Sequence, residues 1–263
     1  MKRTTYLIII AAVTIFCIIF GAFINLRYAG RGWKSARKAI RNSFKYEYDY
    51  DDYDDDTDLD FDDYDLDDDD DFEDNTTAFD SETLEKFDTI SIEGSVLAVE
   101  ISRGNSYSIG SRYTSNRLKP EFSLKNGRLY IVQHAGKRKM VGNHKCNIKI
   151  TVPYGVTIDK LDIDLNVGAV QLSGFDVKSA SIHTDVGAIS VEQLDFDDMY
   201  IKSDVGAVAI ELLQDSNAYQ INANSDLGGI TIDGNAVKRR YSQKGTNNKR
   251  LRIKTNVGGI EIL

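Results

Sequence analysis

The fold is decided by Leu161-Asp-Ile-Asp-Leu-Asn-Val-Gly-Ala-Val-Gln-Leu172, because the chain repeats this stretch. The pattern returns as Ala180-Ser-Ile-His-Thr-Asp-Val-Gly-Ala-Ile-Ser-Val191 and again as Met199-Tyr-Ile-Lys-Ser-Asp-Val-Gly-Ala-Val-Ala-Ile210. A fourth copy occupies residues 219–232 and a fifth occupies residues 251–262. The glycines of the first three copies are about 19 residues apart, and the later intervals lengthen to roughly 22 and 30. Such a short period is typical of stacked units that cannot bury their apolar faces alone.

Aligning the copies produces apolar columns on both sides of the glycine. The two columns before the glycine are Ile163, Ile182, Ile201, Ile221 and Ile253, and then Val167, Val186, Val205, Leu227 and Val257. Apolar and polar residues alternate there, as in a β-strand. Val167 and Val170 are three residues apart, so a straight strand would turn one of them outward. We expect a corner at Gly168 that keeps both columns in one core.

The period also sets the size of one coil. At about 3.3 Å per residue it gives a perimeter of roughly 60 Å, enough for two or three short strands around a filled interior. The sequence therefore predicts an all-β domain over residues 87–263, a single-stranded β-solenoid or β-roll with rungs about 4.8 Å apart. Residues 87–153 would form irregular opening rungs. The last rung ends at Leu263 with no obvious cap, which predicts a free edge for pairing with a partner or a second copy.

The repeats resemble the bacterial toast-rack β-strand-repeat family, whose members are described as candidate adhesins. The resemblance rests on the recurring Asp-Val-Gly-Ala motif and on the preceding Thr151-Val152-Pro153-Tyr154-Gly155 segment, and it covers roughly residues 87–263. It implies a β-coil attached to a membrane and linked to envelope stress or surface interaction. It implies no catalytic residues, so none is carried over.

An apolar run at residues 6–26 contains no charge and is long enough to span hydrocarbon. No small-x-small cleavage site follows it, and Phe16 before Cys17 does not suit a lipoprotein cysteine. We therefore expect residues 1–26 to form one uncleaved transmembrane helix and the protein to be a single-pass protein of the cell membrane.

A basic segment follows at residues 27–48. Trp33, Ala36, Ile40 and Phe44 recur at helical spacing among seven cations, which predicts an amphipathic helix on anionic lipid over residues 27–45. The alternative is a plain basic flank of the membrane span. These cations favour a cytoplasmic β domain, whereas the family resemblance favours the outside, so the side of the membrane stays open.

Residues 49–86 form an acidic low-complexity linker, and the chain as a whole carries a net charge of −9. Like charges at this density repel one another, so we expect a disordered spacer. Weak Ca²⁺ binding is an alternative, although no EF-hand is present, since Asp70 and Thr76 stand where glycine and glutamate are required. A third alternative is docking of the linker onto a basic surface.

Two basic loops interrupt the repeats and are the predicted partner-binding sites. Their cations are Lys137, Arg138 and Lys139 in the first loop and Lys238, Arg239 and Arg240 in the second. They could receive the acidic linker of the same chain or of a neighbour, and the alternative is ordinary solvated loops. We expect no nucleic-acid partner, because a polyanion adjoins these loops in the same chain.

Within the repeats, Asp185 and Asp204 are the cation-binding candidates. They occupy equivalent places before the corner, so they should stack on neighbouring rungs and repel each other. A bound Ca²⁺, or Lys202 reaching across, would relieve that repulsion. His144 and Cys146 provide too few ligands for a zinc site, and no nucleophile–base or phosphate-loop motif is present.

These observations predict a non-enzymatic, membrane-anchored binding or scaffolding module of the bacterial cell envelope, with envelope-stress signalling as a role and no required cofactor. One alternative is a surface adhesin tuned by a cation. An alternative from another class is a β-solenoid enzyme that acts on polysaccharides with grouped carboxylates, which the scattered acidic residues do not favour.

Overall fold

The computed structural model describes residues 80–134 and 145–263. The predicted transmembrane helix (1–26), the basic amphipathic segment (27–48), residues 49–79 of the acidic linker and the loop with Lys137, Arg138 and Lys139 lie outside these ranges. Within the described ranges, no helix has both the length and the hydropathy needed to cross a bilayer.

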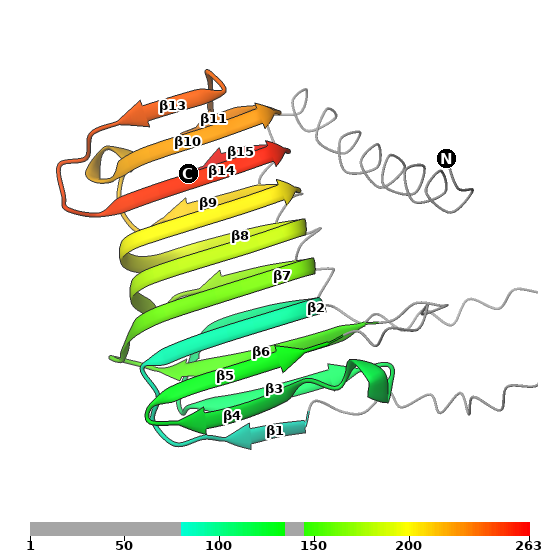
Figure 1. The fold of residues 1–263 in the computed structure, drawn as a ribbon. Coiled ribbons are helices and arrows are strands. Elements are labelled where there is room, and N and C mark those ends of the chain that lie inside the picture. Colours follow the sequence, from blue (N-terminus) through cyan, green and yellow to red (C-terminus); the bar gives the residue numbers. More distant parts are fainter. Residues whose placement is uncertain (1–79, 135–144) are drawn as a thin grey trace, which may run out of the picture.

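The described chain folds almost entirely as β-structure in one continuous sheet that winds around a filled core (Figure 1). The strands are β1 (Asp80–Thr83), β2 (Thr89–Gly104), β3 (Ser108–Tyr113), β4 (Glu121–Lys125), β5 (Arg128–Gln133), β6 (Cys146–Pro153), β7 (Thr157–Ser173), β8 (Asp176–Val205), β9 (Val208–Leu212), β10 (Gln220–Leu227), β11 (Ile230–Ile232), β12 (Asn235–Val237), β13 (Arg240–Gln243), β14 (Arg250–Val257) and β15 (Ile260–Ile262). There are two 3₁₀ turns in the described ranges: η1 (Asn116–Leu118) lies between β3 and β4, and η2 (Ser216–Ala218) lies between β9 and β10.

The sequence repeats are the rungs of this coil, as predicted. β7 pairs in parallel with β8, and the register places Ile163 beside Ile182 and Val170 beside Ile189. Residues 189–194 of β8 pair with β9, and after the next bend residues 198–205 of β8 pair with β14. Each aligned position of the repeat therefore forms a column that runs along the stack.

The column Ile163, Ile182, Ile201, Ile221 and Ile253 is buried, as expected. The second predicted inward column is wrong, because Val167 and Leu227 are 46% and 61% exposed. The inward place lies two residues earlier in each copy, and its members are Leu165, Thr184, Ser203, Ser225 and Thr255. The chain bends directly after this buried column, so the residue two positions later, Val167 in the first copy, lies on the outside of the bend. Buried hydroxyls fill the inside of the corner and form hydrogen bonds there, from Thr184 Oγ1 to Ser203 Oγ (3.2 Å) and from Ser225 Oγ to the Gly258 carbonyl (2.9 Å).

The corner glycines stack directly on one another. In stacking order they are Gly168, Gly187, Gly206, Gly258 and Gly228. A Cβ on Gly187 would collide with the carbonyl oxygen of Gly168, and each further glycine meets the carbonyl of its neighbour in the same way. Glycine is therefore required here for the close approach of backbones between rungs, in addition to the bend that the sequence predicts.

The order of the rungs in space differs from their order in the chain. β14 pairs with β8 on one side and with β10 on the other, and β15 lies between β9 and β11. Figure 1 shows the red fifth copy between the yellow third copy and the orange fourth. The prediction of a free edge at the last rung is therefore wrong. The insertion that follows the fourth copy is long enough to bring the chain back to this central place.

Antiparallel strands cover both ends of the stack. β12 and β13 pair with β11 and β10 at one end. At the other end β2 is itself an inserted rung between β7 and the pair β5 and β6, and β4, β3 and β1 lie beyond it. The outermost strands are short, which limits edge-to-edge association.

Candidate functional site

The outward side chains of β7, β8, β14, β10 and β13 form one flat wall, whose charge changes sign along the stack. One column contains Asp164, His183, Lys202, Lys254, Asn224 and Arg240 in this order. The acidic end is beside β7 and the basic end beside β13. Neighbouring rungs therefore place an acid, a histidine and then cations next to one another.

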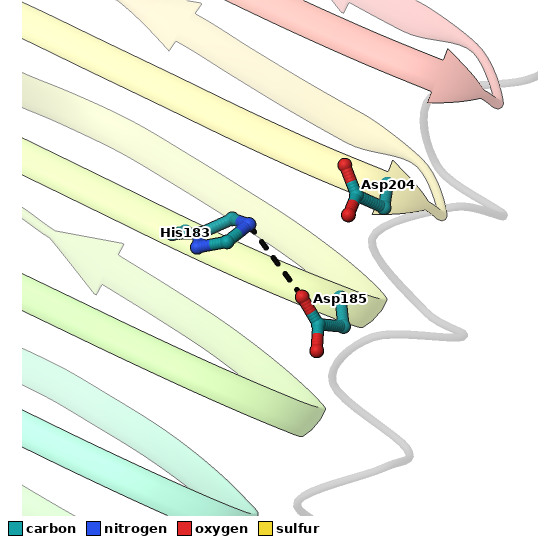
Figure 2. A group of neighbouring side chains, drawn as sticks. All are labelled: His183, Asp185 and Asp204. Carbon is teal, nitrogen blue, oxygen red and sulfur yellow. Dashed lines mark ion pairs between the residues drawn. The ribbon is translucent and has the colours of Figure 1, made fainter.

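His183 lies where the sign changes, next to Asp185 and Asp204 (Figure 2). Its Nδ1 is 3.2 Å from Asp164 Oδ1, and its Nε2 is 3.6 Å from Asp185 Oδ1. Ligand atoms of His183, Asp185 and Asp204 all lie within 4.8 Å of one another. Imidazole nitrogen and carboxylate oxygens are ligands that several divalent cations accept, so this group is where a metal ion would fit among the described residues.

Lys202 already brings a positive charge to this group. Its Nζ is 3.3 Å from Asp204 Oδ1 and 3.1 Å from His183 Nε2. Lys202 therefore neutralises Asp204 and reaches His183 on the neighbouring rung, but no contact between Lys202 and Asp185 is seen among the described residues. A metal ion would have to displace this ammonium group, and Ca²⁺ binding at Asp185 and Asp204 stays a prediction.

The altered rung order also separates like charges in the column before the corner. Asn256 lies between Asp204 and Asp226, because the fifth copy lies between the third and the fourth. Its Nδ2 donates to Asp204 Oδ1 at 2.9 Å. Among the five copies, only Asp185 and Asp204 are left as directly adjacent carboxylates in this column.

The basic end of the wall gathers exposed cations from β13, β14 and the turn between β12 and β13, and we call it the basic wall. Its members are Lys238, Arg239, Arg240, Arg250, Arg252 and Lys254. The second predicted loop thus contains an edge strand that begins at Arg240. The sequence predicts the first three of these cations as partner-binding residues, and the structure adds Arg252 and Lys254 of β14 beside them.

Only some of these cations have partners. Arg250 and Arg252 donate to Asp198 at 3.0 and 3.2 Å. Arg239 Nη1 donates to the Asp226 carbonyl at 3.0 Å. Lys238, Arg240 and Lys254 form no ion pair within the described part of the chain, so their charges are free to meet an anionic partner.

Cys146 cannot serve as a ready metal ligand or nucleophile. The side chain is buried at the start of β6, and burial raises the pKa of its thiol to about 12. A thiol of this kind stays protonated near neutral pH. His144 lies outside the described residues.

Comparison with known proteins supplies the family context. The family model Toastrack DUF4097 matches residues 87–262. A comparison with the curated proteins finds no significant match. Among solved structures, a candidate cell adhesion protein from Clostridium sporogenes is 18% identical, with a TM-score of 0.46, over 70% of this chain and 98% of the other. A candidate adhesin from Bacteroides fragilis is 14% identical, with a TM-score of 0.32, over 70% of this chain and 95% of the other.

Proposed function

The chain belongs to the Toastrack DUF4097 family, and from this premise we propose that it is a non-enzymatic binding or scaffolding module of the cell envelope. The basic wall is the observation that supports the proposal most directly. It presents cations on adjacent strands of a rigid sheet, and three of them have no ion-pair partner among the described residues. A surface of this kind attracts a polyanion over several ångströms, and the attraction weakens as salt is added.

The proposed partner of the basic wall is an acidic polypeptide segment. The chain itself carries such a segment at residues 49–71, so the partner is this segment of the same chain or of a neighbouring copy. Docking within one chain would hold the β domain close to the anchor, and docking between chains would assemble several copies. The first basic loop, with Lys137, Arg138 and Lys139, is proposed to contribute to the same interaction.

The test uses the full chain without residues 49–74 and a synthetic peptide of that sequence. We expect the peptide to bind, and the triple change Lys238→Glu, Arg240→Glu and Lys254→Glu to weaken binding at least tenfold at low salt. A matched control reverses three exposed lysines at the other end of the stack, Lys86, Lys119 and Lys125. Equal binding by both triple variants would show that the basic wall is not the docking surface.

We further propose that the β domain is tethered to the cell membrane by the apolar run at residues 6–26 and acts in envelope-stress signalling. Protease treatment of intact cells would test the topology, with fragments detected by an antibody to residues 87–263. Cleavage of the linker without lysis would place the β domain outside. Protection until lysis would place it in the cytoplasm, and recovery of the chain in the soluble fraction would contradict the anchor.

A cation-tuned adhesin is the second candidate, and the close group of His183, Asp185 and Asp204 favours it. If a divalent cation binds there, Ca²⁺ or Zn²⁺ should raise the thermal midpoint of the full chain but not of Asp185→Asn. The exposed Asp215→Asn serves as a control that keeps the site. A shift of equal size in both variants would remove this candidate.

A further inference from the structure

A surface cavity lies at the corner of the coil opposite the stacked corner glycines. There the loop that joins β13 to β14 lies beside the bend at which β8 passes into its second rung, and together they line this open cavity of about 560 Å³. This volume falls within the range of roughly 300–1,000 Å³ that is usual for small-molecule sites. The loop is at the left of Figure 1, away from the group in Figure 2.

The loop wall of the cavity is firmly held. The amides of Thr246 and Asn247 donate to the carbonyls of Asn217 and Ala218 at 3.1 and 3.0 Å. Lys249 forms an ion pair with Asp195 in the bend of β8. A Cβ on Gly245 would collide with the backbone between Tyr219 and Gln220, so the loop backbone is packed directly on the strand start. The cavity therefore exists before any ligand arrives.

Every residue that lines the cavity, except Gly245, has a polar or charged side chain, and several of these side chains have unused hydrogen-bonding groups. Asp197, Gln220, Lys244 and Asn248 line it, and within the described residues their side chains make no hydrogen bond. Asp198 is different, because it already accepts from Arg250 and Arg252. The free groups include an acceptor, a donor and two amides that can do both.

The composition of the lining selects the class of ligand. No large apolar side chain lines the cavity, which argues against an acyl chain or another apolar ligand. Two carboxylates, Asp197 and Asp198, are balanced by Lys244 and Arg250, which argues against a strongly charged one. Carboxylates, amides and cations together pair with hydroxyl groups, which act as donors and acceptors at once.

We propose that this cavity binds an uncharged saccharide unit. The unit would be held by hydrogen bonds from its hydroxyls to Asp197, Gln220, Lys244 and Asn248. Asp198 already accepts hydrogen bonds from Arg250 and Arg252, so the saccharide would be held mainly by the other four side chains. This activity is separate from the proposed docking of an acidic segment on the basic wall.

Saturation-transfer NMR with the full chain tests the proposal. The probes are the methyl glycosides of glucose, galactose, mannose and N-acetylglucosamine. We expect at least one to bind, and Asn248→Ala and Lys244→Met each to weaken it about tenfold, the effect of losing one hydrogen bond. Both side chains are exposed, so neither variant should unfold the protein.

The control is Asn166→Ala, which removes an exposed asparagine at the opposite corner and should leave binding unchanged. The proposal is overturned if no glycoside gives saturation transfer at high millimolar concentration, or if Asn248→Ala binds like Asn166→Ala. Tighter binding of glucuronate or glucosamine than of the neutral glycosides would overturn the assignment to an uncharged unit. None of these outcomes bears on the basic wall, whose test uses Lys238, Arg240 and Lys254.

Discussion

Gly228 and Gly229 are adjacent in the sequence but differ completely in their surroundings. A Cβ at Gly228 would collide with the carbonyl of Gly258 on the neighbouring rung, whereas a Cβ at Gly229 would meet open space. We expect Gly228→Ala to lower the free energy of unfolding by about 3 kcal/mol or more, because a backbone atom cannot move aside without opening the rungs. Gly229→Ala should stay within about 0.5 kcal/mol of the wild type. Urea unfolding of both variants measures this, and equal losses would refute the close approach of the rungs.

Glu261 is a half-buried carboxylate in the middle of the sheet, in register with Ala209 and Thr231. Burial raises its pKa above the ordinary value of 4.5, so the fold disfavours the charged form. Below pH 4.5 the carboxyl is protonated in both states and Glu261→Gln should unfold like the wild type. As pH rises through the raised pKa, the wild type must place a charged carboxylate in the half-buried site, which lowers its free energy of unfolding. The glutamine variant carries no such charge, so it should become the more stable of the two.

Thermal midpoints between pH 3 and pH 8 test the effect at Glu261, with the exposed Glu121→Gln as a control for the loss of one charge. A constant difference across this range would show that the carboxyl titrates alike in the folded and unfolded chain.

At the scale of the elements, the buried hydroxyls inside the corner link successive turns of β8. Thr184 and Ser203 are both fully buried, and their hydroxyls lie 3.2 Å apart. Removing either one alone should cost about 1–3 kcal/mol, since the other loses its hydrogen-bond partner in the core. The double change Thr184→Val and Ser203→Ala should cost less than the sum of the two. A double-mutant cycle in urea measures the coupling, and strict additivity would contradict the hydrogen bond.

These hydroxyls also explain which parts of the fold the sequence could predict. Period, strand class and the column headed by Ile163 follow from repetition and alternation, and they are confirmed. The column of Val167 was misplaced because valine is more apolar than threonine or serine, although the corner buries the hydroxyls of Thr184 and Ser203. Hydrophobicity alone cannot reveal that a bend reverses which face a residue occupies.

At the scale of the site, repetition predicted correctly that Asp185 and Asp204 would be neighbours on successive rungs, whereas Lys202 pairs with Asp204 and His183 and not with Asp185 among the described residues. It could not place Asn256 beside Asp204, nor Arg252 beside Asp198, because both contacts depend on the order of the rungs in space. That order is not encoded in the period: the fourth and fifth copies carry nearly the same motif and either could pair with the third.

At the scale of the whole molecule, the order of the rungs in space determines how much stability the chain loses when its C-terminal copy is removed. In a solenoid stacked in chain order, stopping after residue 249 would remove only a terminal rung. Here β14 and β15 form hydrogen bonds with rungs on both sides, so the same truncation removes a strand from the middle of the sheet and breaks two interfaces. We expect the chain that ends at residue 249 to lose its cooperative unfolding transition, or to keep a transition of much lower midpoint.

The matched control deletes residues 217–249, which removes the fourth copy and the cap but keeps the fifth. This deletion returns the interval between Gly206 and Gly258 to about 19 residues, the spacing of the first three copies. The fifth copy can then follow the third with a connection of ordinary length, and only one interface between rungs is lost. We expect this chain to fold. If instead the chain ending at residue 249 is the more stable of the two, the fourth copy stacks directly on the third, and the third–fifth–fourth order of the rungs is wrong.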